Sequence, residues 1–463
     1  MTEMTRRRFI GRSLASMGGI GAASRFAQAS TGAMTAAAAD AVQGANARVR
    51  LAVMGVGGMG RGDMQTFLNQ SRFNVEVPLI CDVDDAMLAE AMKIFDARDL
   101  KHPDTEKDFR RVIDRSDEWD VLLVGTPDHW HALPTILACQ AGRDVYCEKP
   151  SANSVGESKA MCDAARRYDR VVQIGTQWKA SNYFAEAVAY VHSGKLGPIR
   201  HVRCWTSLNW YGSVGDVPDN ETPAGVDYDM WLGPAPLRAF NRARFHFTFR
   251  WFWDYAGGLM TDWGVHLLNI ALWAMKVDFP KRVSSSGGKY VYHDMAEAPD
   301  TQTTLYDFGD FTMVWEHQAG INHGPEGKPH GVAFYGTNGT LILGLDGWHV
   351  VPEPPRPEHG RGVMLPLEPV EAVSKKFDAA ADPEMGRVKL VADFLECVQS
   401  RRRSMMDIEI AHHVTTVAHL GNLALRTGRS IEYDAAQMRV IGNEPANAMI
   451  TRPYRSPWKL PSL

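Results

Sequence analysis

The sequence predicts an α/β protein whose N-terminal part is a doubly wound parallel sheet. β-favouring runs alternate with helical stretches from residue 48 to about 175, and the first run leads directly into GVGGMG (55–60). Two polar segments, GTPDHWH (125–131) and CEKP (147–150), each follow a later predicted strand. Ligands of such sheets bind beyond the carboxyl ends of the strands, so these segments are the first candidates for a site.

Chain length, net charge and cysteine pattern limit the number of domains and the kinds of ligand that the sequence allows. A chain of 463 residues can hold two or three domains, and its formal net charge of −4 gives no electrostatic case for nucleic acid. The run 401–403 (RRR) is predicted to be a solvated helix end. The six cysteines form no CxxC pair and lie among apolar residues, so we expect buried thiols and no zinc site.

The first 29 residues are predicted to be a twin-arginine signal peptide. TRRRFIG (5–11) precedes a weakly apolar run, and AQA (27–29) offers a cleavage site. The alanine-rich residues 30–47 are predicted to be a linker, and no stretch is long and apolar enough to span a membrane. We therefore expect an exported, periplasmic protein.

The first strand, turn and helix have the pattern of a dinucleotide site. Strand Val49–Met54 enters the glycine motif, and a helix is expected over 63–70. Gly55 permits the tight turn, Gly57 lets the backbone approach a pyrophosphate, and Gly60 lets helix and strand pack closely. Gly58 and Met59 complete the turn, and the pyrophosphate would lie on the helix N-terminus.

Asp82 predicts which dinucleotide binds. It ends the second strand, Val75–Cys81, about 20 residues after the last glycine. A carboxylate here hydrogen-bonds the ribose 2′-hydroxyl and repels a 2′-phosphate, so NAD is favoured over NADP.

The alternation continues to residue 174. Strands are expected at 119–124, 144–147 and 171–174, with helices from the end of GTPDHWH to about 142 and over 155–168. Side chains just beyond these strand ends are expected to contact the cofactor. They are Thr126, Pro127, His131, Glu148 and Lys149.

The chain resembles the Gfo/Idh/MocA family because it contains, in this order, the motifs GVGGMG, CDVD, TPDHWH and CEKP. GTQ (175–177), GKLG (194–197) and GGLMTDWGVH (257–266) extend the resemblance into the second half. The resemblance implies a Rossmann domain over 48–175, then a substrate-binding and oligomerisation domain over 176–440 with a large open, mostly antiparallel sheet. It also implies a homodimer or homotetramer. The proline-rich end, 441–463, is predicted to be an extended arm.

The resemblance also implies the catalytic set. Hydride loss from a carbinol carbon leaves a hydroxyl proton to be removed. Asp262 and His266 are four residues apart in a predicted helix and would share a face. The family pattern implies His266 as general base, Asp262 as its partner and Lys149 as the donor to the substrate oxygen. A turn lysine and an ordinary helix pair are the structural alternatives.

Three further residues are predicted to bind substrate: Trp178, Lys179 and Arg250, because the region after GTQ faces the nicotinamide in the family. Leu267 departs from members close to inositol dehydrogenase, which often have Asp there. Their substrate preference is therefore not carried over.

No metal site is predicted. His412, His413 and His419 share a helical stretch with Glu409, but the second half of a metal motif is missing. We expect these histidines on a helix surface.

The leading hypothesis is an exported NAD-dependent oxidoreductase that transfers hydride between a sugar or polyol hydroxyl carbon and a tightly bound cofactor. The alternative is an NAD-dependent glycosidase that works by transient oxidation, elimination and re-reduction. A non-catalytic sugar-binding protein is a third possibility, against which the three candidate catalytic groups argue. Export favours tight binding because no dependable NAD pool exists outside the cytoplasm.

Overall fold

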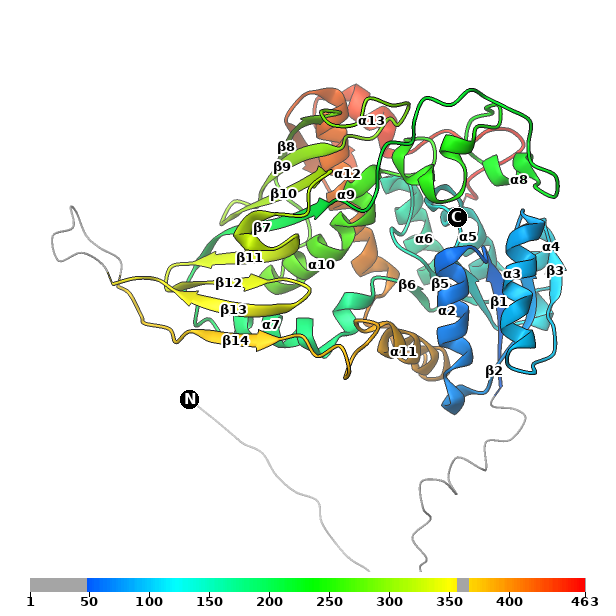
Figure 1. Ribbon diagram of the computed structural model, residues 1–463, viewed down its shortest axis with the longest axis horizontal. Helices are drawn as coiled ribbons and strands as arrows, with labels where there is room; N and C mark the ends of the chain where they lie inside the picture. Colours follow the sequence, from blue (N-terminus) through cyan, green and yellow to red (C-terminus); the bar gives the residue numbers. More distant parts are fainter. Residues whose placement is uncertain (1–47, 356–365, 463) are drawn as a thin grey trace, which may run out of the picture. The chain divides into compact units, whose positions relative to one another are not determined.

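The computed structural model describes residues 48–355 and 366–462 (Figure 1). The predicted signal peptide and linker lie outside these residues. Within the described part of the chain, no helix has both the length and the apolar character that a membrane crossing requires.

The first sheet has six parallel strands in the order β3-β2-β1-β4-β5-β6, which confirms the doubly wound prediction. The strands are β1 (Val49–Met54), β2 (Val75–Cys81), β3 (Asp104–Glu106), β4 (Val121–Val124), β5 (Asp144–Cys147) and β6 (Val172–Ile174). The helices of this half are α2 (Gly58–Leu68), α3 (Asp85–Asp96), α4 (Phe109–Asp114), α5 (Ala132–Gln140) and α6 (Val155–Arg167). Helix α2 begins five residues before the predicted start, because the second half of GVGGMG is itself its first turn.

The second sheet has ten strands in the order β14-β13-β12-β11-β7-β10-β9-β8-β15-β16. Its pairs are antiparallel except β7 with β10, so the predicted large, mostly antiparallel sheet is confirmed. The strands are β7 (Ile199–Leu208), β8 (Arg282–Gly288), β9 (Thr301–Asp307), β10 (Thr312–Ala319), β11 (His330–Gly336), β12 (Gly339–Leu343), β13 (Gly347–Pro352), β14 (Val373–Lys376), β15 (Ile431–Asp434) and β16 (Arg439–Val440).

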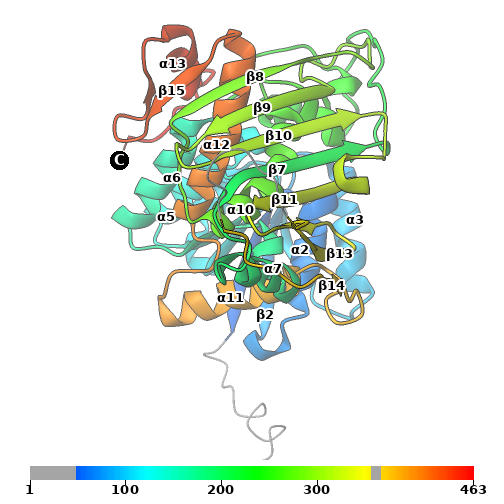
Figure 2. The ribbon, with the colours of Figure 1, turned by 90° about the vertical axis from the view of Figure 1, so that its left-hand side faces the viewer.

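Helices cover one face of this sheet and leave the other open (Figure 2). The covering helices are α7 (Asn182–His192), α10 (Gly264–Met275) and α12 (Ile408–Thr427). Alternation along β10 explains the arrangement: Met313 and Trp315 point into the helix-side core, whereas Val314 is only partly buried.

Residues from far along the chain complete the core of the first domain. Helix α11 (Arg387–Ser400) packs beside α2, and Leu390 and Phe394 are fully buried in the first core. Strand β6 is tied to the same region, since the Ile174 amide donates to the Met406 carbonyl at 3.0 Å. The predicted boundary at residue 175 therefore omits part of the first domain.

A long connection between β7 and α9 (Gly258–Asp262) forms a layer of its own. It contains only α8 (Tyr228–Leu232) and the short 3₁₀ turns η6 (Arg242–Arg244) and η7 (His246–Trp251). An aromatic cluster around Trp231, Phe245 and Tyr255 holds it together. Because the connection has its own core, it can keep a fixed position without regular strands.

The C-terminal segment is not extended throughout, in contrast to the prediction. Residues Glu444–Ile450 form helix α13, which begins where the Asn443 side chain accepts from the Ala446 amide. After it, the chain packs on its own first domain. Arg452 pairs with Glu157 at 2.8 Å, and Trp458 lies among Phe109 and Trp130.

The predicted buried thiols are confirmed, since all six cysteines are free and buried. The helix-surface expectation is wrong for His412 and His419, which are buried where α12 packs on α6 and the loop before it. His412 Nδ1 lies 3.1 Å from Ser158 Oγ, and His419 Nε2 lies 3.0 Å from the Ala152 carbonyl. Over residues 48–355 and 366–462, no group of three or more His, Cys, Asp or Glu side chains is placed to hold a metal ion.

Trp458 tests whether the arm contributes to stability. Trp458→Ala should lower the free energy of unfolding by about 3 kcal/mol, because it removes a buried indole from three aromatic and cationic neighbours. Chemical denaturation of the purified protein measures the change. Trp210→Ala is the control: this indole is 50% exposed, and the change should stay within about 0.5 kcal/mol. Equal midpoints for the two variants would contradict the packing role.

Candidate active site

The glycine motif makes a turn that admits no side chain at two of its three key positions. Gly55 has a φ of +82°, and a Cβ on Gly60 would lie 1.9 Å from the Gly55 carbonyl oxygen. At Gly57 and Gly58, by contrast, no atom lies within 4 Å of the position that a Cβ would take, so this side of the turn opens into a cavity. The turn and the N-terminus of α2 thus present free backbone N–H groups to an anion.

Asp82 is held in place at the end of β2. Its Oδ2 accepts from the Val56 amide at 2.9 Å, and its Oδ1 accepts from the Asp84 amide at 3.1 Å. Burial raises the pKa of Asp82, and these amides oppose the rise. The carboxylate lines the same cavity as the glycine turn.

The cavity has a volume of about 520 Å³ and is bounded by both domains. From the first domain come Gly57, Gly58, Met59, Asp82, Val83, Gly125, Thr126, Pro127, Asp128, Glu148 and Lys149; from the second come Met230, Trp231, His246, Phe247, Phe249, Arg250 and Asp262. The Thr126 hydroxyl is buried and has no hydrogen-bond partner in the described part of the chain.

An ion-pair cluster lies in the cavity wall. Lys149 Nζ lies 2.5 Å from Asp262 Oδ1, and Arg250 Nε lies 3.5 Å from the same oxygen. Burial alone would raise the pKa of Asp262, but the charges of Lys149 and Arg250 outweigh it and hold that pKa well below its usual range. Asp262 is therefore ionised and positions both cations.

His266 is placed differently from the prediction. Helix α9 ends at Asp262 and α10 begins at Gly264, so a break at Trp263 separates Asp262 from His266. The carboxylate of Asp262 pairs with Lys149, while the imidazole packs on Trp178 with ring centroids 4.5 Å apart. Burial and the charge of Lys149 lower the pKa of His266 to about 3, so the ring is neutral at pH 7. Its role as base stays a prediction.

Asp128 is a cavity residue to which the sequence analysis gave no role. It follows β4, is 7% exposed and lines the cavity beside Lys149 and Asp262. Burial raises its pKa to about 8, against the charges of Arg250 and Lys149. Its position in GTPDHWH, beyond a strand end, was the available signal; its burial was not readable from the sequence.

Glu148 faces a second buried carboxyl group. Burial raises the pKa of Glu148 and that of Asp63, which is fully buried on α2, and each group acts on the other. Gly175 makes room for this pair, since a Cβ there would lie 2.0 Å from Glu148 Oε1. Two carboxyl groups in this setting favour sharing one proton, so the pair behind Lys149 carries one negative charge instead of two.

Four side chains predicted to contact the cofactor or the substrate are not among those that line the cavity: His131, Trp178, Lys179 and His266, whose ring packs on Trp178. His131 bridges two loops instead, with Nδ1 2.6 Å from the Pro150 carbonyl and Nε2 2.9 Å from the Thr126 carbonyl. Trp178 stacks between Phe184 and His266. The Lys179 ammonium lies over the Trp273 ring, and burial lowers its pKa to about 8.

The connection between β7 and α9 is tied to the loop after β2. The Asp85 amide donates to the Gly225 carbonyl at 3.2 Å, the Asp227 amide donates to the Val83 carbonyl at 2.8 Å, and His246 Nε2 lies 2.8 Å from Asp84 Oδ2. We call these contacts the strap. Since the strap begins one residue after Asp82, the second domain covers that end of the cavity.

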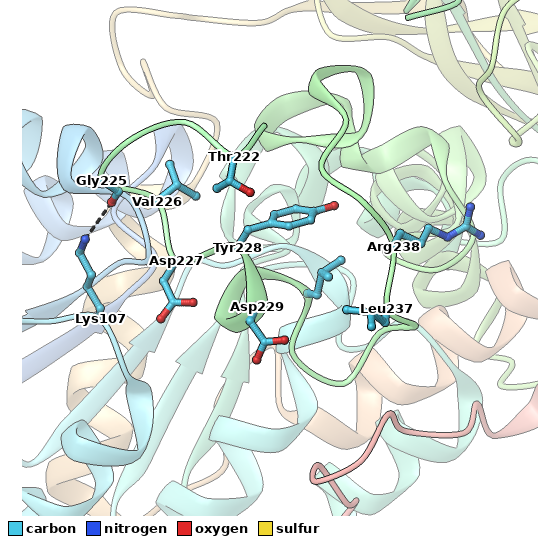
Figure 3. A pocket seen from close by; sticks show the side chains of 10 residues that line it. Lys107, Thr222, Gly225, Val226, Asp227, Tyr228, Asp229, Leu237 and Arg238 are labelled. Carbon is cyan, nitrogen blue, oxygen red and sulfur yellow. Dashed lines mark hydrogen bonds between the residues drawn. The ribbon is translucent and has the colours of Figure 1, made fainter. Parts of the chain in front are cut away.

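Figure 3 shows an open depression on the outer side of the strap, where Lys107 donates to the Gly225 carbonyl at 2.8 Å. Three of its four charged lining residues are paired: Lys107 with Asp85 at 2.7 Å, Asp229 with Arg455 at 2.6 Å and Arg238 with Asp254 at 2.5 Å. It lacks the glycine turn and Lys149, so we assign the site to the cavity between the domains.

Comparison with known protein families assigns the chain to a family. Residues 49–176 match the model described as oxidoreductase family, NAD-binding Rossmann fold. Residues 191–299 and 369–460 match the C-terminal alpha/beta domain of the same family. The chain belongs to the Gfo/Idh/MocA oxidoreductase family. The first domain is thus an NAD-binding Rossmann domain.

Similar Gfo/Idh/MocA sequences include a levoglucosan dehydrogenase from Pseudarthrobacter phenanthrenivorans, 29% identical over 168 residues. That alignment covers 35% of this chain and 42% of the relative. A glycosyl hydrolase family 109 protein from Shewanella pealeana is 30% identical over 123 residues, 26% of each chain. The chain therefore aligns with less than half the length of either relative.

Solved structures share the fold over most of the chain. A levoglucosan dehydrogenase in complex with NADH and levoglucosan gives a TM-score of 0.62 at 17% identity, covering 83% of this chain and 99% of that one. An aldose-aldose oxidoreductase from Caulobacter crescentus complexed with glycerol gives 0.61 at 19% identity, with the same coverage of each chain.

The cavity fits a dinucleotide. The open face at Gly57 and Gly58 accepts a pyrophosphate, and Asp82 is placed for the adenosine ribose. The same cavity also contains the unpartnered Thr126 hydroxyl and the Lys149–Asp262–Arg250 cluster. The residues present are thus those that a bound NAD requires.

Breaking the Lys149–Asp262 pair should destabilise the fold. Lys149→Met should lower the free energy of unfolding by about 3 kcal/mol, because it leaves a buried carboxylate without its closest counter-charge. A double-mutant cycle with Asp262→Asn should then give a coupling of at least about 1 kcal/mol. Lys159→Met is the matched control, since Lys159 pairs with Asp163 at the same 2.5 Å on the surface; we expect less than about 0.5 kcal/mol. Additive effects of the two site variants would contradict the pairing.

Proposed function

We propose that this chain is an NAD-dependent oxidoreductase that transfers hydride between a hydroxyl-bearing carbon of a sugar or polyol and a tightly held nicotinamide. The observation that carries the proposal is the Lys149–Asp262–Arg250 cluster in the wall of the dinucleotide cavity. When bound, the nicotinamide supplies the hydride acceptor, and the chain's own residues handle the proton and the orientation.

Lys149 is suited to bind the oxygen of the reacting carbon. Asp262 holds the ammonium group by one of its hydrogens, which leaves the others free for an oxygen atom in the cavity. A fixed cation favours the negative charge that develops on that oxygen as its proton leaves. His266 follows Asp262 by four residues and is neutral at pH 7, which suits the predicted role of proton acceptor; its ring packs on Trp178 behind the residues that line the cavity.

A carbohydrate substrate is supported by the shape and chemistry of the cavity. Phe247, 49% exposed, and Phe249 offer apolar ring faces beside the charged Arg250. Sugars present both kinds of surface, apolar ring faces and a rim of hydroxyl groups. Two of the similar proteins are also a levoglucosan dehydrogenase and an aldose-aldose oxidoreductase.

Tight retention of the cofactor is supported by the strap, which covers the Asp82 end of the cavity. Retention would suit export by the twin-arginine route, which carries folded proteins to the periplasm and lets NAD be loaded beforehand. We also propose that the open face of the ten-stranded sheet pairs with a second copy in a homodimer or homotetramer. Leu305 on β9 is 44% exposed on that sheet, which supports such a contact.

A second candidate function is glycoside cleavage without net redox change. In such a cycle, a ring carbon is oxidised, the aglycone leaves, water adds and the carbon is reduced again. The similarity to a glycosyl hydrolase family 109 protein and the buried carboxyl group of Asp128 in the cavity favour this candidate.

The test of the first function is single-turnover reduction of bound cofactor. Purified full-length protein is first denatured to identify any released dinucleotide, and native protein is then mixed with aldoses, polyols and glycosides. Lys149→Met should slow the appearance of reduced nicotinamide at least about 100-fold, because the cation that stabilises negative charge on the substrate oxygen is lost. Lys179→Met is the control, since this lysine lies over Trp273 and away from the cavity lining. No dinucleotide, together with turnover only at high added NAD, would refute retention. Equal rates for both variants would refute the site.

Retention has its own test in His246→Ala. Loss of the His246–Asp84 contact should speed release of bound NAD by about threefold, a modest effect because the histidine side chain is 41% exposed. Transfer of the nucleotide to a trapping dehydrogenase measures the rate. His102→Ala, which removes a similar surface contact with Asp96, should leave the rate unchanged. Unchanged release in His246→Ala would show that the strap does not retain the cofactor.

A further inference from the structure

Asp128 is the one carboxyl group among the cavity-lining residues without an assigned purpose. It begins the turn η4 (Asp128–Trp130), four residues after β4 ends. In the described residues, no other residue donates a hydrogen bond to its carboxylate oxygens. Other buried carboxylates in this chain are well partnered: Glu157 pairs with Arg452, and Asp300 accepts from three consecutive backbone amides.

The nearby cations do not neutralise Asp128. Charged groups reach it from three elements: Lys149 after β5, Arg250 on η7 and Asp262 on α9. Both cations lie against Asp262, at 2.5 Å and 3.5 Å. Burial consequently dominates at Asp128 and raises its pKa to about 8, so the group is mostly protonated at neutral pH.

The topology places Asp128 in the same cavity wall as Lys149, where the reacting carbon is expected. Strands β4 and β5 are parallel neighbours, with Val124 opposite Cys147, and Asp128 and Lys149 follow them within a few residues. Neighbouring strands lie about 5 Å apart, which is close to the span of a sugar ring. A ring whose oxidised carbon faces Lys149 therefore presents the oxygen of another ring carbon to Asp128.

We propose that Asp128 is a second proton-transfer residue of the cavity, which protonates the glycosidic oxygen of a bound glycoside. This inference rests on the proposed function, because the leaving group can depart only after a ring carbon has been oxidised to a carbonyl.

Atoms and electrons balance across the cleavage. The carbon that lies between the carbonyl carbon and the anomeric carbon loses its proton to His266, which has already passed the hydroxyl proton to solvent. The C–H electrons form a C=C bond, the C–O bond to the aglycone breaks, and its oxygen takes the Asp128 proton and leaves as an alcohol. Water then adds to the anomeric carbon and returns a proton to Asp128, while the neighbouring carbon regains its proton. The carbonyl carbon then regains the hydride, and its oxygen regains a proton from solvent through His266, so the cofactor ends unchanged.

The test compares leaving groups in the full-length protein with its bound cofactor. A dinitrophenyl glycoside needs no acid to leave, whereas a methyl glycoside does. The sugar is chosen beforehand as one that reduces the bound nicotinamide in a single turnover, from gluco- and galactosides of both anomeric forms. Asp128→Asn should slow release from the methyl glycoside about 100-fold and from the dinitrophenyl glycoside less than about threefold. Asp128→Glu should recover part of the loss.

The pH profile gives a second readout. Only protonated Asp128 can donate, so release of methanol by the wild type should fall as the pH rises through the Asp128 pKa of about 8. The dinitrophenyl substrate should not show this fall.

Three outcomes overturn the inference. Equal losses on both substrates, or loss of bound NAD from Asp128→Asn, would make Asp128 a residue that positions the cofactor. Wild-type protein that reduces its nicotinamide yet releases neither aglycone would refute the inference and leave the proposed oxidoreductase intact. Protein that neither reduces its cofactor with any sugar nor cleaves a glycoside would refute both.

Discussion

The contact between Lys149 and Asp262 joins the two halves of the molecule at the place where chemistry is expected. Lys149 stands at the end of a strand of the first sheet, and Asp262 ends a helix of the second domain. Both residues line the cavity, and their 2.5 Å contact joins the two domains at its wall. A shift of either domain would separate a buried charge pair, so the relative position of the domains and the ionisation of the site are linked.

The first domain could largely be predicted from the sequence because its signals are local. The strands Val49–Met54, Val75–Cys81 and Asp144–Cys147 were predicted with their observed ends, and the glycine motif marks the first turn by steric necessity. The contributions of α11 and Trp458 to the same core could not be predicted. They depend on packing between residues far apart in sequence, for which apolar periodicity names a face but no partner.

The site divides in the same way. The motifs predicted that Lys149 and Asp262 would belong to the site, and the family resemblance added Arg250 as a substrate-binding residue; all three line the cavity. Helical spacing and the family resemblance both suggested that Asp262 would be the partner of His266, but a lysine from the other domain pairs with that carboxylate. Burial also escaped the sequence. Asp128 and Asp262 are both buried near Lys149 and Arg250, yet the pKa of Asp128 is raised and that of Asp262 is lowered. The difference depends on which carboxylate contacts the cations directly, and the sequence does not show this.

The C-terminal arm has a consequence for how the chain becomes a folded protein. Arg452 and Trp458 close over helices of the first domain, yet they are synthesised only after the whole second domain. The Rossmann half therefore cannot reach its final packing while the chain is still being made, and a nucleotide bound early would meet an incomplete protein. A chain that lacked the arm would leave the part of the first core around Phe109 and Trp130 uncovered. Packing of the arm therefore distinguishes a fully folded molecule from a truncated one.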